Sequence, residues 1–364
     1  MMVRQQALVT LTCALLLLLC GAGCGLIGPP SIRGGRPAYN DALVATNSQQ
    51  VLAMIVRMRY GEPSGLLAVS SITANIQIQV NAGAEFGIGT ESSYQGNLVP
   101  LAAGFAYEEN PTISYVPVHG ERYMRQLLAP IPLDLTMLLL GSLCDSPQAI
   151  ALLVRSINGM RNPDFLWTDS AEADPRFARL VELLAQLARQ GRLTWGQESG
   201  SDSSFVLALT GAAGGLDPQL AQLFNLLGFA APEDLDGVIT LPVQLGIGSS
   251  AEPTIRLETR SLFDLFQIAA ASVEVPKEHL ESGAAHRLPP SGPLGRSIQI
   301  RRSKDRPDGA VAEVRHHGWW YSIDGTDTAS KLTFWILESL ISVRIADTVE
   351  HGKARPVLTV PVSR

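Results

Sequence analysis

The densest group of potential metal ligands lies towards the C-terminal end, where His316 and His317 are followed by Asp324 and Asp327. Imidazole nitrogens and carboxylate oxygens are ordinary zinc ligands in proteins. The pattern predicts one strand over residues 311–323, however, and adjacent residues of a strand point to opposite faces. Asp324 precedes a glycine, which is typical of a turn, and Asp327 is typical of a helix N-cap. We therefore interpret all four as structural residues and predict no metal site and no cofactor.

Three consecutive aromatic residues, Trp319, Trp320 and Tyr321, follow the histidine pair. In a strand, Trp319 and Tyr321 would share one face and Trp320 would take the other. Aromatic faces bind sugars or peptides, but they pack into cores and interfaces more often. The three residues are therefore a candidate binding surface, with core packing as the alternative.

Potential nucleophiles stand in surroundings that do not suit catalysis. Ser70, Ser71 and Ser261 lie outside the G-x-S-x-G pattern that presents a serine nucleophile. Cys144 precedes an aspartate and a predicted helix start, where a thiolate can be favoured. We interpret it as a buried, inert cysteine. The sequence assigns no catalytic residue, and we predict that the chain is not an enzyme.

The first 23 residues are typical of a secretory signal peptide. Arg4 makes the start positive, Ala7–Cys20 is almost entirely apolar, and small residues occupy positions 21–23. A membrane-spanning helix needs about 20 apolar residues, and this run is shorter. An uncleaved single-span anchor is therefore the less favoured alternative.

The residues Ala22-Gly23-Cys24 resemble the lipobox of bacterial lipoproteins, although Gly21 stands where that motif normally begins with leucine. The resemblance implies that the Cys24 sulfur receives a diacylglyceryl group and that the new N-terminus is acylated, for example with palmitate. Two or more acyl chains give stable membrane attachment. Lipoproteins kept in the inner membrane often carry aspartate after the cysteine. Here Gly25 follows, so the resemblance implies the outer membrane.

Composition sets limits on the remainder of the chain. Residues 24–38 are rich in glycine and proline and predict a flexible, lipid-anchored tether before a body over residues 39–364. A division of this body at the 281–295 loop is an alternative. Hydrophobic residues make up 46% of the chain, which is enough for a full core. A formal net charge of −6 argues against a nucleic-acid partner, because phosphate binding needs a basic surface.

Helix and strand signals alternate irregularly along the body, which predicts an α+β fold with mixed sheets and packed amphipathic helices. Ser146, Asp174 and Asp217 each precede a proline, as N-cap residues do. Predicted helices cover 48–59, 146–158 and 327–346, with two more opened by Asp174 and Asp217. Predicted strands cover 205–210, 238–247, 255–259, 297–302, 311–323 and 357–362.

Residues 74–88 alternate strictly between apolar and polar, which predicts a long strand with two different faces. Residues 98–106 and 113–118 are candidates for the return strand of an amphipathic hairpin near 74–118. One interpretation packs this hairpin on the body with its polar side in the periplasm. In the other, a hairpin from each copy of an oligomer lines an outer-membrane pore, since 9–11 residues of tilted strand cross a bilayer.

Several further segments resemble a group of uncharacterised proteobacterial lipoproteins. They are the helix around Gln50–Tyr60, the stretches Asn110–Gly120 (NPTISYVPVHG), Asn158–Asn162 and Thr259–Pro276, and Trp320–Phe334 leading to the final PVLTVPV. The resemblance covers most of the mature chain. It implies lipid anchoring and an envelope role, and it supplies no active site.

These observations favour a membrane-anchored lipoprotein that is a structural or interaction component of the cell envelope. It would lie at the outer membrane with its body facing the periplasm. Its expected partners are membrane lipid, through acylated Cys24, and an envelope protein or a second copy of the chain. The alternatives are a periplasmic hydrolase and a subunit of an oligomeric outer-membrane pore built through the 74–118 hairpin. An enzyme should bring titratable groups together, whereas a scaffold should show an apolar surface patch or an unpaired strand edge.

Overall fold

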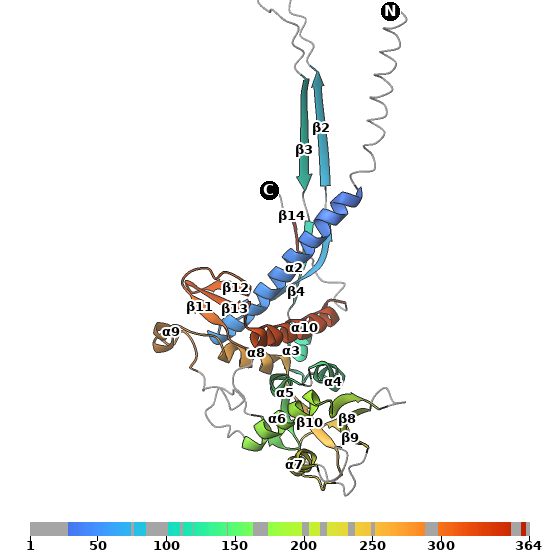
Figure 1. Ribbon diagram of the computed structural model, residues 1–364. Helices are drawn as coiled ribbons and strands as arrows, with labels where there is room; N and C mark the ends of the chain where they lie inside the picture. Colours follow the sequence, from blue (N-terminus) through green and yellow to red (C-terminus); the bar gives the residue numbers. More distant parts are fainter. Residues whose placement is uncertain are drawn as a thin grey trace, which may run out of the picture. The chain divides into compact units, whose positions relative to one another are not determined.

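The computed structural model describes most of the chain after residue 27 (Figure 1). The described ranges are 28–73, 76–84, 101–109, 112–118, 120–143, 145–162, 174–198, 204–211, 217–231, 237–248, 252–287, 298–350 and 358–361. The predicted signal peptide and Cys24 lie outside them. Within these ranges helices combine with a mixed six-stranded sheet and smaller antiparallel sheets, so the predicted α+β class is confirmed.

The chain folds into two compact units, each assembled from separate stretches. Unit 1 comprises Met1–Glu62, Ala269–Leu288 and Arg296–Glu338, and unit 2 comprises Pro63–Ile268, Pro289–Gly295 and Ser339–Arg364. A single division at the 281–295 loop does not describe this arrangement. The reason is that an early helix packs on late strands, so unit 1 needs residues from both ends of the chain.

Unit 1 consists of helix α2 (Gly28–Arg59), a small sheet, α9 (Lys277–Glu281) and the start of α10 (Thr328–Glu350). The sheet has the antiparallel order β11-β13-β12, formed by Arg301–Ser303, Trp319–Asp324 and Ala310–His316. Helix α2 packs against β12. The apolar core contains Leu52, Ile55, Val56, Tyr321, Ile323, Phe334 and Leu337, all of them at most 1% exposed.

Helix α2 begins 20 residues before the helix that the sequence predicts, so positions 28–38 are helical rather than part of a flexible tether. The prediction weighed glycine and proline as helix breakers. Pro29 and Pro30 fall in the first turn, where a missing N–H costs no hydrogen bond. Only Pro37 lies further inside the helix.

The predicted strand over 311–323 is wrong at its centre, because the chain reverses there. His317 and Gly318 have φ angles of 45° and 77°, the left-handed pair that forms a two-residue hairpin turn. Strands β12 and β13 therefore lie side by side, with His316 opposite Trp319. The sequence pattern did not indicate the turn because the residues on both sides of it favour strands.

Unit 2 contains a six-stranded mixed sheet in the order β6-β5-β10-β9-β8-β7, in which only β9 and β10 run parallel. The strands are β5 (Val154–Ile157), β6 (Met160–Arg161), β7 (Leu193–Gln197), β8 (Phe205–Thr210), β9 (Val238–Leu245) and β10 (Ile255–Thr259). The helices of this unit include α3 (Glu121–Leu128), α4 (Leu133–Ser142), α5 (Pro147–Leu153), α6 (Pro175–Arg189), α7 (Pro218–Leu227) and most of α8 (Leu262–Ala271). Buried apolar residues of α5, α6, α7 and the sheet form the core.

All three predicted N-caps of this unit are confirmed. The side chains of Ser146, Asp174 and Asp217 each accept a hydrogen bond from a backbone N–H of the helix that follows. The helix after Ser146 ends at Leu153, however, and not near residue 158. Asn158 and Gly159 have φ angles of 47° and 80° and form a two-residue turn between β5 and β6, not a helix end.

The segment that alternates in sequence forms a long antiparallel hairpin, also in unit 2. Strand β1 (Leu66–Thr73) pairs with β4 (Thr112–Val118), which also pairs with β14 (Leu358–Pro361). Strand β2 (Ile76–Ala84) pairs with β3 (Leu101–Glu109). Thr73 pairs with Thr112 and Ile76 with Glu109, so the two ladders share one register. In the described ranges, no helix is both long and apolar enough to span a membrane.

Candidate functional site

Among the described residues, titratable and hydrogen-bonding side chains cluster in two places, one in each unit. Cys24 and Cys144, which the sequence analysis singled out, lie outside the described ranges. Ser261 belongs to the group in unit 2. His316, His317 and Tyr321 belong to the group in unit 1, where they meet residues far away in the sequence.

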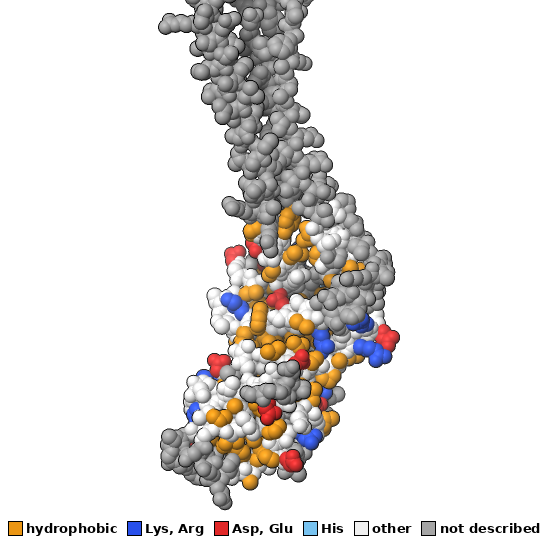
Figure 2. Space-filling view, turned by 90° about the vertical axis from the view of Figure 1, so that its right-hand side faces the viewer, with side chains coloured by type: hydrophobic (Ala, Val, Ile, Leu, Met, Phe, Trp, Pro, Cys, Tyr) orange, Lys and Arg blue, Asp and Glu red, His pale blue; other side chains and the backbone are white. Residues whose placement is uncertain are grey.

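The group in unit 2 lies beside a surface groove of about 410 Å³. Apolar side chains contribute much of its lining, and several of them face solvent. Ile247 is 82% exposed, Leu128 52% and Leu245 50%. Figure 2 shows apolar side chains reaching the surface in several places on the face that it draws, between scattered charged ones. The groove thus combines an exposed apolar rim with a charged base.

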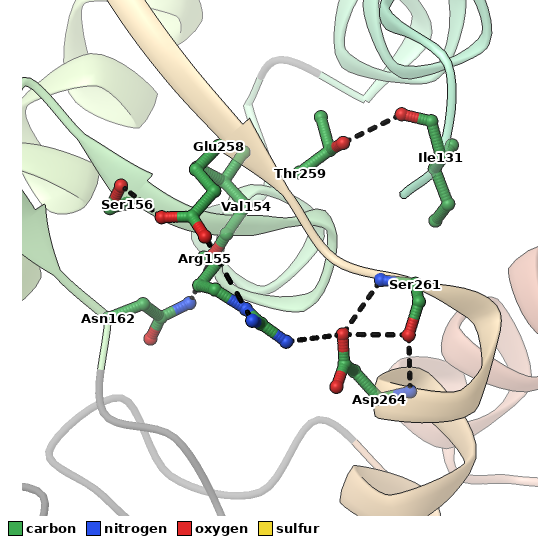
Figure 3. A network of polar contacts seen from close by, with 9 residues as sticks. All are labelled: Ile131, Val154, Arg155, Ser156, Asn162, Glu258, Thr259, Ser261 and Asp264. Carbon is green, nitrogen blue, oxygen red and sulfur yellow. Dashed lines mark hydrogen bonds and ion pairs between the residues drawn. The ribbon is translucent and has the colours of Figure 1, made fainter. Parts of the chain in front are cut away.

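Arg155 on β5 is the centre of that charged base (Figure 3). Its Nη2 donates a hydrogen bond to Asp264 Oδ2 at 2.6 Å, and its Nη1 lies 3.9 Å from Glu258 Oε1. Glu258 also accepts a hydrogen bond from Ser156 Oγ at 3.1 Å. One cation therefore lies between two carboxylates that approach it from β10 and α8.

Ser261 has a structural partner in this network. Its Oγ donates to Asp264 Oδ2 at 2.8 Å and accepts from the Asp264 N–H at 3.1 Å, a reciprocal arrangement that caps the start of α8. Asp264 Oδ2 also accepts the Ser261 N–H at 2.8 Å. The Ser261 hydroxyl is thus engaged in the cap of this helix.

Two further hydrogen-bonded side chains fix the strands that carry the network (Figure 3). Asn162 is buried and donates from Nδ2 to the carbonyls of Ala151 and Val154, at 2.6 and 2.7 Å. Thr259 donates from Oγ1 to the carbonyl of Ile131 at 2.7 Å. The groove base is therefore rigid, and its charges have partners within the unit. What it offers a ligand is mainly the apolar rim.

The group in unit 1 is built around Tyr60, at the end of α2. Its hydroxyl lies 2.5 Å from the hydroxyl of Tyr321 and 2.8 Å from Nδ1 of His279. Burial raises the pKa of both tyrosines above the usual value, so both remain neutral hydrogen-bonding groups. The Tyr60 ring also packs against His316 and His317, with centroid distances of 5.1 and 4.9 Å.

Glu62 contacts both histidines. His317 Nε2 donates a hydrogen bond to Glu62 Oε1 at 2.7 Å, and His316 Nε2 lies 3.1 Å from Glu62 Oε2. The hydrogen bond from His317 lowers the pKa of the Glu62 carboxyl, and burial lowers the pKa of His316. At neutral pH the group is therefore a carboxylate beside a neutral imidazole at position 316.

The turn at His317 corrects the prediction that adjacent histidines must point to opposite faces. His316 ends a strand, but His317 adopts the left-handed conformation, and the two ring centroids lie 4.3 Å apart. Glu62 and Tyr60 did not stand out in the sequence because more than 250 positions separate them from the histidines. The dipeptide His-Gly between two strand-like segments was the one signal that pointed to a turn.

Asp324 and Asp327 do not join this group. Asp324 accepts hydrogen bonds from the N–H and hydroxyl of Thr326, which lowers its pKa. Asp327 accepts from the N–H and hydroxyl of Ser330 at the start of α10 and likewise has a lowered pKa. Both serve the turn and the helix cap that the sequence predicts.

The three aromatic residues Trp319, Trp320 and Tyr321 do not form one surface. Tyr321 is fully buried, so the prediction that includes it in a binding surface is wrong. Trp319 is part-buried and carries the Lys304 ammonium 3.5 Å and the Arg302 guanidinium 4.6 Å from its ring centroid. Two cations of the same chain therefore already contact the Trp319 ring.

We compared the chain with known protein families, curated proteins and solved structures. No family model, curated protein or solved structure matches this chain. The resemblance to uncharacterised lipoproteins stays a prediction, and the two sites rest on their own residues.

Proposed function

We propose that this chain is a lipoprotein anchored to the outer membrane through acylated Cys24, and that its α+β body is a structural or interaction component of the cell envelope. The observation that carries the proposal is the order of the first 24 residues: a positive start, a short apolar run, small residues and then a cysteine. Acyl chains would hold the protein to lipid, while the body remains available to a partner.

The groove of unit 2 supports the interaction part of this proposal. Arg155 already pairs with both Glu258 and Asp264, so a ligand that relied on these charges would have to break existing ion pairs. Its rim, in contrast, exposes Leu128, Leu245 and Ile247 to water. Exposed apolar patches of this kind mark protein interaction sites. The occupant we propose is an apolar segment of an envelope protein, with a second copy of the chain as the other outcome to test.

The anchor is tested by metabolic labelling with a radioactive fatty acid, comparing the native chain with Cys24→Ala. The expected result is label on the native protein, no label on the variant, and native protein in the outer-membrane fraction. An unlabelled native chain would overturn the proposal and raise the standing of the periplasmic hydrolase.

The groove is tested by placing a photo-crosslinking residue at position 247 in the full chain, in cells. Position 238 is the matched control, because Val238 is 66% exposed on β9 but does not line the groove. We expect one identified envelope protein, or the chain itself, to crosslink at 247 and not at 238. Equal crosslinking at both positions would remove the groove from the proposal.

The oligomeric pore remains a second candidate because of the register of β2 and β3. Positions 76, 78, 80, 82 and 84 are opposite 109, 107, 105, 103 and 101, so mostly apolar residue types share one face along both strands. The other face of the return strand carries Ala102, Gly104, Ala106 and Glu108, so this strand lacks the regular apolar–polar alternation of the first. Each strand has nine residues, close to the span of a tilted membrane strand. Conductance of the purified full chain in planar bilayers, lost on Val80→Asp, is the expected result for a pore; absence of conductance would exclude it.

A further inference from the structure

Glu62, His316 and His317 form a compact set of metal-ligand atoms in unit 1. One carboxylate oxygen and the two imidazole nitrogens all lie within 4.8 Å of one another. Two histidines and one carboxylate are a donor set that zinc proteins use, and imidazole nitrogen favours zinc over magnesium or calcium. In a tetrahedral site with bonds of about 2.1 Å, neighbouring ligand atoms stand roughly 3.4 Å apart. His317 Nε2 lies 2.7 Å from Glu62 Oε1 and His316 Nε2 lies 3.1 Å from Glu62 Oε2, so the two contacts end on different oxygens of the carboxylate and both are somewhat shorter than that spacing.

The Nε2 atom of His316 is the second observation that points to a ligand. It is buried, and its 3.1 Å contact with Glu62 Oε2 does not have the geometry of a hydrogen bond. Buried polar atoms are nearly always hydrogen-bonded, and an exception calls for an explanation such as a missing ion. A metal ion between the carboxylate and this nitrogen would satisfy it.

The backbone at His317 is the third observation. With a φ of 45°, His317 adopts the left-handed conformation. In a two-residue hairpin turn, asparagine and glycine adopt this conformation at a lower conformational free-energy cost than histidine does. The turn does not need a histidine, and in this conformation the second imidazole lies beside the first, with ring centroids 4.3 Å apart. Strain of this kind is typical of functional positions.

We propose that Glu62, His316 and His317 bind a zinc ion. The Tyr60 ring packs against both imidazoles and is itself held by Tyr321 and His279, so it positions the ligands without binding the metal. His317 is 46% exposed and Glu62 35%, whereas His316 is 16% exposed. The site therefore opens towards solvent on the side of His317. With three protein ligands, the fourth position belongs to water or to a ligand from solution.

The test uses the full chain in detergent, purified without a histidine tag and stripped of metal with a chelator. Isothermal titration with zinc should show one site per chain, and magnesium should show none. Cobalt should give the intense visible absorption of a tetrahedral site containing nitrogen ligands. If the titration shows no zinc binding, or binding that does not fit one site per chain, the proposal is overturned.

The decisive variant is His317→Asn, because asparagine suits the turn and the hairpin is retained while one ligand is removed. We expect its zinc affinity to fall at least tenfold, and Glu62→Gln to behave in the same way. His286→Asn is the matched control, since His286 is an exposed histidine of unit 1 outside the ligand set. Circular dichroism verifies that each variant folds. Zinc affinity unchanged in folded His317→Asn, or lost equally in His286→Asn, would overturn the assignment. Loss of acylation in the labelling experiment would leave this result unaffected, so the two proposals fail separately.

Discussion

Two hairpin turns with the same backbone, one in each unit, use different residues at their first position. Asn158-Gly159 in unit 2 has φ angles of 47° and 80°, and His317-Gly318 in unit 1 has 45° and 77°. In the part of the chain that the structure describes, Asn158 and His317 are the residues other than glycine with a positive φ. Because the φ angles of the two turns are nearly the same, the roles of the two side chains can be compared directly.

Asn158 serves the fold of its own unit. It is buried, it donates from Nδ2 to the carbonyl of Leu227 at 2.9 Å, and its Oδ1 accepts the N–H of Arg256 at 2.8 Å. Asparagine also tolerates the left-handed conformation well. His317 tolerates it less well, stays half exposed and contacts Glu62 and His316. Asn158 thus provides hydrogen bonds within its unit, whereas His317 lies against two other titratable side chains.

The largest effect should come from Asn158→Ala. Loss of two buried hydrogen bonds, at about 1 kcal/mol each, and a left-handed alanine, at about 1 kcal/mol, should lower the free energy of unfolding by roughly 3 kcal/mol. Thermal unfolding followed by calorimetry measures it. Asn158→Gly, which keeps the turn but not the bonds, should lose only about 2 kcal/mol. Equal losses in both variants would show that the conformation of residue 158 contributes nothing.

A smaller effect of opposite sign is expected for His317→Asn in the absence of metal. Asparagine relieves a conformational cost of up to about 1 kcal/mol, and the exposed contact with Glu62 is worth little. The melting temperature should therefore rise slightly. With saturating zinc the order should reverse, because only the native chain gains stability from binding. A variant that is less stable than the native chain without metal would show that His317 is there for the fold.

The smallest effect concerns Glu338 on α10, a carboxylate whose charged form is disfavoured by burial. Burial raises its pKa, and Ser48 Oγ donates a hydrogen bond to it at 2.5 Å. Since the folded pKa exceeds the unfolded value of about 4.5, its contribution to stability is complete below that pH and is lost as the pH rises through the folded pKa.

Glu338→Gln should therefore raise the free energy of unfolding at pH 7 by on the order of 0.5 kcal/mol, because the amide keeps an acceptor for Ser48. Below pH 4 the difference should vanish. Melting curves of both chains between pH 4 and 7 measure it. A gain that is the same at every pH would show that the charge of Glu338 is not its cause.

Local signals in the sequence predicted local structure well. The caps at Ser146, Asp174 and Asp217 were predicted because a short polar side chain before a proline has one favourable use. The two hairpin turns were missed for a related reason. Asn-Gly was interpreted as a helix end and His-Gly was not recognised, since a two-residue turn becomes evident only when the flanking strands are known to pair.

The metal-ligand set could not be predicted, because one of its members comes from the other end of the chain. Glu62 follows the last turn of α2, and only the packing of α2 on β12 brings it to the histidines. Likewise, only the register of the long hairpin shows which residues of its return strand share a face with those of the first strand. Sequence periodicity identifies elements, whereas sites formed by distant segments depend on packing that no local pattern contains.

The discontinuous make-up of unit 1 sets an order for its folding. In a chain that emerges from its N-terminus onwards, α2 appears early, but the strand on which it packs ends at His316. Residues 63–268 of unit 2 are available long before that strand is complete. Until then, Leu52, Ile55 and Val56 have no core to enter, and exposed apolar surface of this kind favours aggregation. A chaperone that binds α2 would therefore have to remain bound until β12 has been synthesised.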